Sequence, residues 1–206
     1  TTGGVVNLIS TPNPEKRKGN IEAISNERGS TDLHVSFGDV AGDWSYLLET
    51  VQRSNQGFKE IDRSNRDTGF DIEDYVGKLR WQGERQSLTA KLQYSEETSN
   101  ATYLGLTDKD FDRDPNRRYG LSSIDQMNNR HFGGSLTHQF AWTDTVSSTA
   151  TLYHNDFKRN WFKLSGGGSF IDGANAGNAN DQGILDGTVD VAGLNYKNNN
   201  RAYISE

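Results

Sequence analysis

The sequence predicts an all-β protein, an antiparallel up-and-down β-barrel that crosses a membrane, and three observations predict it. Apolar and polar residues alternate over segments of about ten residues, the length of a membrane-spanning strand. Short and long connections alternate along the chain. The composition is polar, with 32% hydrophobic residues, yet 10% of residues are aromatic, and disordered chains are poor in aromatics.

The alternation is plainest over residues 86–97. Leu88 and Leu92 fall on one face of this predicted strand, and Thr89 and Lys91 fall on the other. No segment has the pattern of a helix of useful length. The predicted strands cover residues 19–28, 31–40, 44–55, 70–82, 86–97, 129–142, 146–163 and 199–206.

The connections predict one rim of short turns and one rim of long loops, which is the layout of an up-and-down barrel. A soluble β-sandwich is the alternative, but structureless loops of about thirty residues are uncommon in compact domains. Aromatic residues near strand ends fit an interfacial girdle in the barrel or a core in the sandwich. These aromatic residues are Trp44, Trp81, Trp142, Trp161 and Phe162.

The first sixteen residues follow a different pattern. A Gly-Gly pair precedes a short apolar run, Val5 to Ile9, which Pro12 and Pro14 end. We therefore expect one strand and a stiff linker that belong to another domain. The predicted division is residues 1–16 as the end of that domain and residues 17–206 as the N-terminal part of the barrel.

Composition and motifs argue against several function classes. The net charge of −6 without a basic stripe makes a nucleic-acid partner unexpected. No nucleophile–base pair, phosphate loop or clustered metal ligands are present, so we expect neither an enzyme nor a resident cofactor or metal. Carboxylates alternate over residues 107–116 but lack the glycine and glutamate of a calcium loop, so this segment is expected to be a solvated loop or turn.

The long loops carry clustered cations that are candidates for binding an anion. Arg117 and Arg118 lie in the loop at 98–128, and Arg130 begins the next predicted strand. Guanidinium groups bind carboxylates through two parallel hydrogen bonds. Ordinary surface charge is the alternative for any one of them.

Several motifs together resemble TonB-dependent outer-membrane receptors. Gly3-Gly-Val-Val-Asn-Leu-Ile-Ser10 resembles the end of their plug domain. Similarity to the ferric dicitrate type lies in three further segments: Thr102-Tyr-Leu-Gly-Leu-Thr-Asp108, Asp114-Pro-Asn-Arg-Arg-Tyr119 and Tyr153-His-Asn-Asp-Phe-Lys-Arg-Asn-Trp-Phe-Lys-Leu164.

The resemblance implies a plugged barrel of about twenty-two strands in the outer membrane of a Gram-negative bacterium, of which this chain supplies about eight. It implies import of ferric citrate or another ferric siderophore, driven by a TonB-type energy-coupling protein that acts through a region outside this chain. Outer-membrane lipid would surround the barrel. Arg117, Arg118 and Arg130 are then the expected contacts to the anionic chelate.

Two other functions stay open at this point. A non-transporting adhesin or structural protein of the cell surface fits the same strand pattern. The same receptor architecture also fits another cargo, such as cobalamin, nickel or an oligosaccharide.

Overall fold

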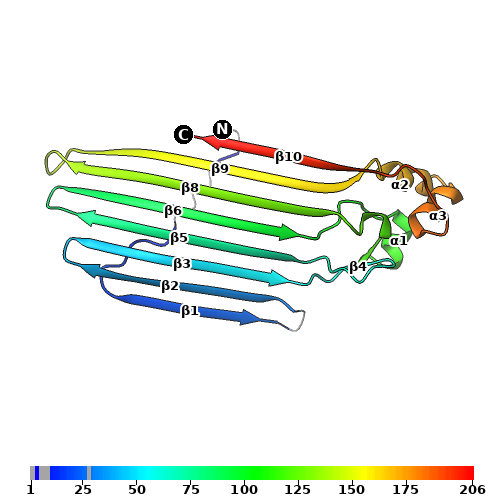
Figure 1. The fold of residues 1–206 in the computed structure, drawn as a ribbon, viewed down its shortest axis with the longest axis horizontal. Coiled ribbons are helices and arrows are strands. Elements are labelled where there is room, and N and C mark those ends of the chain that lie inside the picture. Colours follow the sequence, from blue (N-terminus) through cyan, green and yellow to red (C-terminus); the bar gives the residue numbers. More distant parts are fainter. Residues whose placement is uncertain (1–2, 5–9, 27–28) are drawn as a thin grey trace.

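The computed structural model describes residues 3–4, 10–26 and 29–206. Eight strands form one antiparallel sheet in the order β1-β2-β3-β5-β6-β8-β9-β10, and β4 and β7 form a small parallel pair (Figure 1). The elements are β1 (Lys18–Ser25), β2 (Thr31–Ala41), β3 (Trp44–Asn55), β4 (Glu60–Ile61), β5 (Phe70–Gln82), β6 (Gln86–Ser99), α1 (Asp108–Arg113), β7 (Arg117–Arg118), the 3₁₀ helix η1 (Gly120–Ser122), β8 (Gln126–Ala141), β9 (Ser147–Ser165), α2 (Gly168–Asn175), α3 (Ala179–Asp186) and β10 (Asn195–Ser205).

The predicted antiparallel all-β class is confirmed, and each predicted strand corresponds to one strand of the large sheet. The ranges predicted for β3 and β5 match the structure, and the other strand ends differ by a few residues. The described sheet is open. Its two edges are β1 and β10, and neither edge pairs with another strand within the described residues (Figure 1).

The register divides the sheet into two chemically different faces. On one face, which we call the apolar face, Leu48 lies opposite Gly77, Gly77 opposite Leu92, and Leu92 opposite Gly134. Large hydrophobic side chains on this face are exposed, and Leu92 retains 60% of its accessible surface. The exposed members are Ile21, Phe37, Trp44, Leu48, Tyr75, Leu79, Leu88, Leu92, Phe132, Leu136, Leu152 and Ile204.

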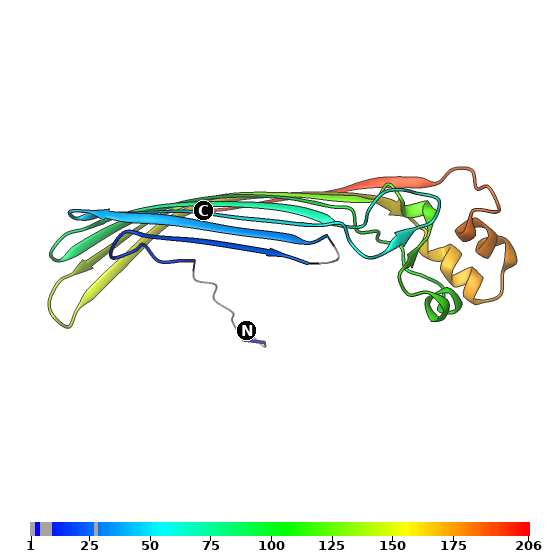
Figure 2. The same cartoon turned by 90° about the horizontal axis from the view of Figure 1, so that it is seen from below.

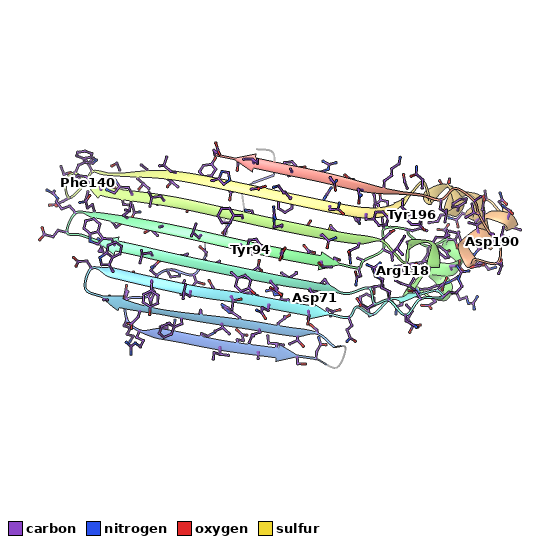
Figure 3. The ribbon with its side chains drawn as sticks, viewed as in Figure 1. Asp71, Tyr94, Arg118, Phe140, Asp190 and Tyr196 are labelled. Carbon is purple, nitrogen blue, oxygen red and sulfur yellow. The ribbon has the colours of Figure 1, made fainter. Side chains whose placement is uncertain are left out.

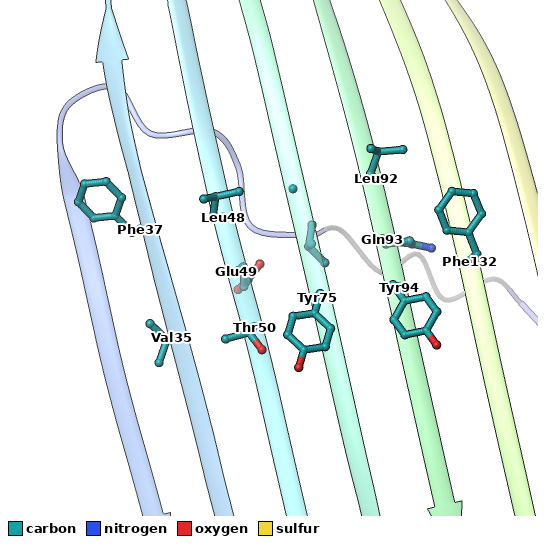
Figure 4. A pocket seen from close by; sticks show the side chains of 12 residues that line it. Val35, Phe37, Leu48, Glu49, Thr50, Tyr75, Leu92, Gln93, Tyr94 and Phe132 are labelled. Carbon is teal, nitrogen blue, oxygen red and sulfur yellow. The ribbon is translucent and has the colours of Figure 1, made fainter.

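The polar face carries the alternate residues, and the N-terminal linker lies against it. Thr11 donates a hydrogen bond to Glu49 (2.9 Å), and the Asn13 amide donates to the Ser45 carbonyl (3.0 Å). Lys78 also bonds to the backbone carbonyl of Thr11. In Figure 4, which views the apolar face at close range, the linker passes behind the strands.

The expectation that the chain lacks helices of useful length is wrong, because three helices lie in the predicted loops. α2 and α3 have 8 residues each, and α1 has 6. Local signals explain two of them. Thr107 accepts from the Asp110 N–H and caps α1, and Asn178 accepts from the N–H groups of Asn180 and Asp181 and caps α3.

The segment 107–116 is therefore a capped helical turn followed by a tight turn at Asp114-Pro115, where the Arg117 N–H donates to the Asp114 carbonyl (3.2 Å). Of the two expectations for this segment, the turn is confirmed. None of the helices within the described residues is long and apolar enough to cross a membrane.

The helices and long loops form a cap at one end of the sheet, opposite the short turns (Figures 1 and 2). We define the cap as residues 56–69, 100–125 and 166–194. Its hydrophobic core consists of Leu104, Tyr119 and Leu185 together with Leu164 at the end of β9. Tyr196 of β10 packs against this core, and its hydroxyl donates to the Leu121 carbonyl (2.8 Å), so cap and sheet are joined there (Figure 3).

Two predictions about particular segments have different outcomes. The expected plug strand, Val5 to Ile9, lies outside the described residues. Trp161 departs from the expected girdle, because it lies on the polar face, whereas Trp44 and Trp81 are cross-strand neighbours on the apolar face beside the short turns.

Candidate functional site

Arg117, the first predicted ligand contact, lies in β7 within the cap and binds three carboxylates. Its guanidinium group contacts Asp62 (2.9 Å), Asp110 (3.1 Å) and Asp186 (2.6 Å). The hydrogen bond to Asp62 contributes most to raising the pKa of Arg117. Because these carboxylates come from three segments of the cap, Arg117 ties the segments together.

A buried hydrogen-bond network continues from Arg117. The Tyr119 hydroxyl is fully buried, donates to Asp110 (2.6 Å) and accepts from the Thr107 N–H (3.1 Å). Burial is the largest single influence on Asp110 and opposes its ionisation. Asp110 forms hydrogen bonds with Tyr119, Gln182 and Thr107, and the positive charge of Arg117 lies beside it. Together these interactions outweigh burial and lower the pKa of Asp110.

Arg118 follows directly in β7 but has a different environment. Its guanidinium group donates to the backbone carbonyls of Pro115 (3.0 Å) and Arg117 (2.5 Å) and forms no ion pair within the described residues. Partial burial lowers the pKa of Arg118. Figure 3 shows it in the cap beyond the ends of the strands.

Arg130 lies on β8, on the apolar face beyond its hydrophobic rows. It is opposite Glu96 on one side and Lys158 on the other. It lines a groove with Lys158 and Asn160, whereas Arg117 lines a cavity of about 430 Å³ within the cap. The three predicted arginines therefore lie in separate surroundings, and their role as ligand contacts stays a prediction.

Asp125 fixes the loop before β8 to the sheet. Its carboxylate is fully buried and accepts from the backbone N–H groups of Tyr103 (3.1 Å) and Leu164 (2.9 Å). Burial raises the pKa of Asp125 despite these bonds. The contact holds Tyr103 close to the end of β9.

Four cations lie on β9 and β10 on the polar face, at the end of these strands that is next to the cap. Lys163 is the register partner of Lys197, and Arg159 is the register partner of Arg201. We call these four residues the cation strip. Like charges directly opposite one another in a sheet are destabilising. None of the four forms an ion pair within the described residues; the closest influence of opposite charge is Asp125, which interacts electrostatically with Lys163.

Aromatic rings lie between the members of the strip. The Lys163 ammonium is 3.2 Å from the ring centre of Tyr103 and 4.5 Å from that of Trp161, and the Arg159 guanidinium is 5.8 Å from Trp161. Tyr103 meets Trp161 edge-on at 5.1 Å. Two buried donors here, Trp161 Nε1 and Arg159 Nε, have no hydrogen-bond partner in the part of the chain that the structure describes. The site thus offers an anion positive charge held beside aromatic rings, together with unused donors.

The cation strip was not among the residues predicted from the sequence, although its spacing is visible there. Arg159, Trp161 and Lys163 occur at every second position, and Lys197, Asn199 and Arg201 repeat that spacing. Only the register shows that the two sets share one face and meet in like-charged pairs. Within the described part of the chain, no group of three or more metal-ligating side chains is close enough to hold a metal ion.

No protein-family model, curated protein or solved structure matches this chain. The assignment of function therefore depends on the geometry of the sheet, the cap and the polar face.

Proposed function

We propose that this chain is part of the wall of a TonB-dependent outer-membrane transporter that imports an iron chelate. The single observation that carries the proposal is the exposed apolar face of the sheet. Monomeric soluble proteins rarely expose contiguous apolar patches larger than a few hundred Å². A lipid environment provides the partner that such a face lacks in water.

The dimensions of the apolar face fit a bilayer. On β8 its rows run from Phe132 to Phe140, which is about 27 Å along the strand at ~3.4 Å per residue. Outer-membrane barrels carry an apolar band of about 25 Å, flanked by aromatic rows. Trp44, Trp81 and Phe140 lie at the short-turn end of these rows, and Tyr75 and Tyr94 lie toward the cap (Figures 3 and 4).

The open edges and the polar face support a closed barrel with an occupied interior. Unpaired backbone groups of β1 and β10 would be costly in lipid, and closure with further strands would satisfy them. Linker residues 10–17 contact the polar face, which supports a plug domain on that side. The short turns would then face the periplasm, where the energy-coupling protein acts, and the cap would face the medium.

Uptake of iron by cells tests this proposal. The complete reading frame that encodes this chain is expressed in cells deprived of other iron receptors, and uptake of radiolabelled ferric citrate and of a ferric siderophore is measured. We expect uptake that stops when the proton gradient is collapsed, because the transport is energised from the inner membrane.

Other results would identify the alternatives. Uptake of cobalamin, nickel or an oligosaccharide instead of iron would keep the architecture and change the cargo. Surface exposure and cell adhesion without energised uptake of any of these compounds would support a structural or adhesive protein and reject the transporter.

A further inference from the structure

We propose that the cation strip on the polar face binds a small polyanion that enters from the cap end. The inference rests on the proposed function, because only a closed barrel makes the polar face an interior wall. It differs from the sequence-based assignment, which placed the ligand contacts at Arg117, Arg118 and Arg130.

The strip is electrostatically unfavourable, because its cations face one another in like-charged pairs across β9 and β10. Side chains directly opposite each other in an antiparallel pair are about 5 Å apart at Cβ, and Lys163–Lys197 and Arg159–Arg201 are such pairs. The facing residues of the neighbouring strand are uncharged: Asn129 lies opposite Arg159, and Met127 opposite Trp161. Bound negative charge would relieve a repulsion that the described residues leave largely uncompensated.

The strip also contains two buried N–H donors that have no hydrogen-bond partner among the described residues. Trp161 Nε1 and Arg159 Nε are shielded from water and donate to no atom of the described residues, and a buried donor without a partner is unfavourable. Both atoms belong to residues between or within the cation pairs. Acceptor oxygens of an anion would satisfy them.

Other cations near the cap differ from those of the strip, because they lie beside carboxylates. Arg117 is engaged by three carboxylates, and Arg130 and Lys158 lie on the apolar face beside Glu96 and Asp156. Among the described residues, the strip forms no ion pair with an acidic side chain; the fully buried Asp125 interacts electrostatically with Lys163.

The spacing of the pairs defines the kind of ligand. Arg159 and Lys163 are four residues apart, which is about 13 Å along the strand. Trp161 lies between them in the strand, and Tyr103 forms a T-shaped pair with its ring. A bulky polycarboxylate or polysulfonate with acidic groups at its periphery and an apolar or aromatic centre matches this arrangement.

Binding of a fluorescent aromatic polyanion tests the inference. Pyrenetetrasulfonate is titrated with protein from the complete reading frame in detergent micelles, and its anisotropy gives the dissociation constant. Saturable binding is expected, and it should weaken at least tenfold in Arg159→Gln/Arg201→Gln and in Lys163→Gln/Lys197→Gln. The matched control is Lys78→Gln/Lys91→Gln, which removes the same charge from another cross-strand pair of cations, on β5 and β6, and should change binding less than twofold.

The strip variants should also remain folded and unfold at a higher temperature than the parent in the absence of anion, because a repulsive pair is removed. This readout separates lost binding from lost folding. Absence of saturable binding would overturn the inference and indicate that carboxylates from another part of the protein neutralise the strip. Equal weakening in the control would also overturn it, since net charge alone would then explain binding.

The outcomes also separate this inference from the proposed function. Strip-dependent binding without energised uptake would reject the transporter and retain the site. Energised uptake of ferric citrate, with binding unchanged in both strip variants, would retain the transporter and reject the site.

Discussion

The cap buries large apolar side chains, whereas one face of the sheet leaves them exposed. In the cap, Tyr119 and Leu185 are fully buried, and polar groups such as Asp125 are hydrogen-bonded inside. In the sheet, Ile21 and Leu152 keep 76% and 74% of their surface exposed. The cap therefore has the interior typical of a protein folded in water, and the sheet has an exposed apolar face that matches the lipid-facing exterior we propose for it.

The difference is what we expect if the cap lies in water and one face of the sheet lies in lipid. Satisfied polar networks give the cap a defined shape in an aqueous medium. Regular alternation gives the sheet one apolar and one polar face, which we propose meet lipid and water. The following predictions test this contrast, beginning with the largest expected effect.

A charge on the apolar face should be far more damaging than the same charge on the polar face. Leu92→Arg is expected to destabilise the protein folded in lipid vesicles by about 2–4 kcal/mol, because arginine is costly on a lipid-facing strand. Gln93→Arg, on the next residue and the other face, should change stability by about 0.5 kcal/mol or less. Urea unfolding of the full-length protein in vesicles measures both values, and equal effects would remove the contrast between the faces.

Loss of Arg117 should loosen the cap without affecting the sheet. Arg117→Gln leaves three carboxylates without their shared cation, and about 2 kcal/mol of cap stability should be lost, since the group is 21% exposed and partly screened. Hydrogen exchange of cap amides measures the change. Arg118→Gln is the control, because among the described residues the Arg118 guanidinium group donates hydrogen bonds to backbone carbonyls and to no carboxylate; an equal effect there would contradict the role of the carboxylate cluster.

The cap should also be sensitive to acid. The pKa of Asp110 is lower in the folded cap than its ordinary value of 3.8, so the folded state binds this proton less readily than the unfolded state. Its stabilising contribution is therefore present above about pH 4 and is lost as the pH falls through the folded pKa. Asp110→Asn should weaken the cap near neutral pH and reduce its loss of stability on acidification. Hydrogen exchange between pH 3 and 7 measures this, and an unchanged acid response would exclude Asp110 as its source.

The smallest effect is expected at the start of α3. Asn178→Ala removes the side-chain oxygen that accepts from two N–H groups, and it should destabilise the helix by about 1 kcal/mol. Asn180→Ala, on the exposed first turn, is the control. Hydrogen exchange of the α3 amides compares the two variants. Equal exchange rates in both would show that the Asn178 side chain does not stabilise the start of α3.

The sheet was predictable because each strand shows its own period. In β5, for example, polar and apolar residues alternate, and the turn before β6 is short, so both ends of the strand are visible in the sequence. The cap was less predictable, since α2 and α3 are short and their apolar residues pack mainly against segments distant in sequence. Asn178 and Thr107 were capping signals that the polar composition of the loops obscured.

The candidate site was predictable only in its residue types. Clustered arginines predicted anion binding, yet Arg117 bonds to Asp62, Asp110 and Asp186, whose approach depends on the folding of the cap. The pairs Lys163–Lys197 and Arg159–Arg201 depend on the register of β9 with β10 across a long connection. Neither arrangement follows from local sequence.

A labelling scan of β6 tests most directly the claim that one face meets lipid and the other water. The chain has no cysteine, so single-cysteine variants at residues 88–94 introduce one labelling site each into this chain. With spin labels on the full-length protein in vesicles, collision with oxygen should peak at 88, 90, 92 and 94, and collision with a water-soluble nickel chelate at 89, 91 and 93. If accessibility to the two relaxation agents does not alternate along β6, the account is contradicted. It is also contradicted if positions 88, 90, 92 and 94 are inaccessible to both agents, as in a soluble core.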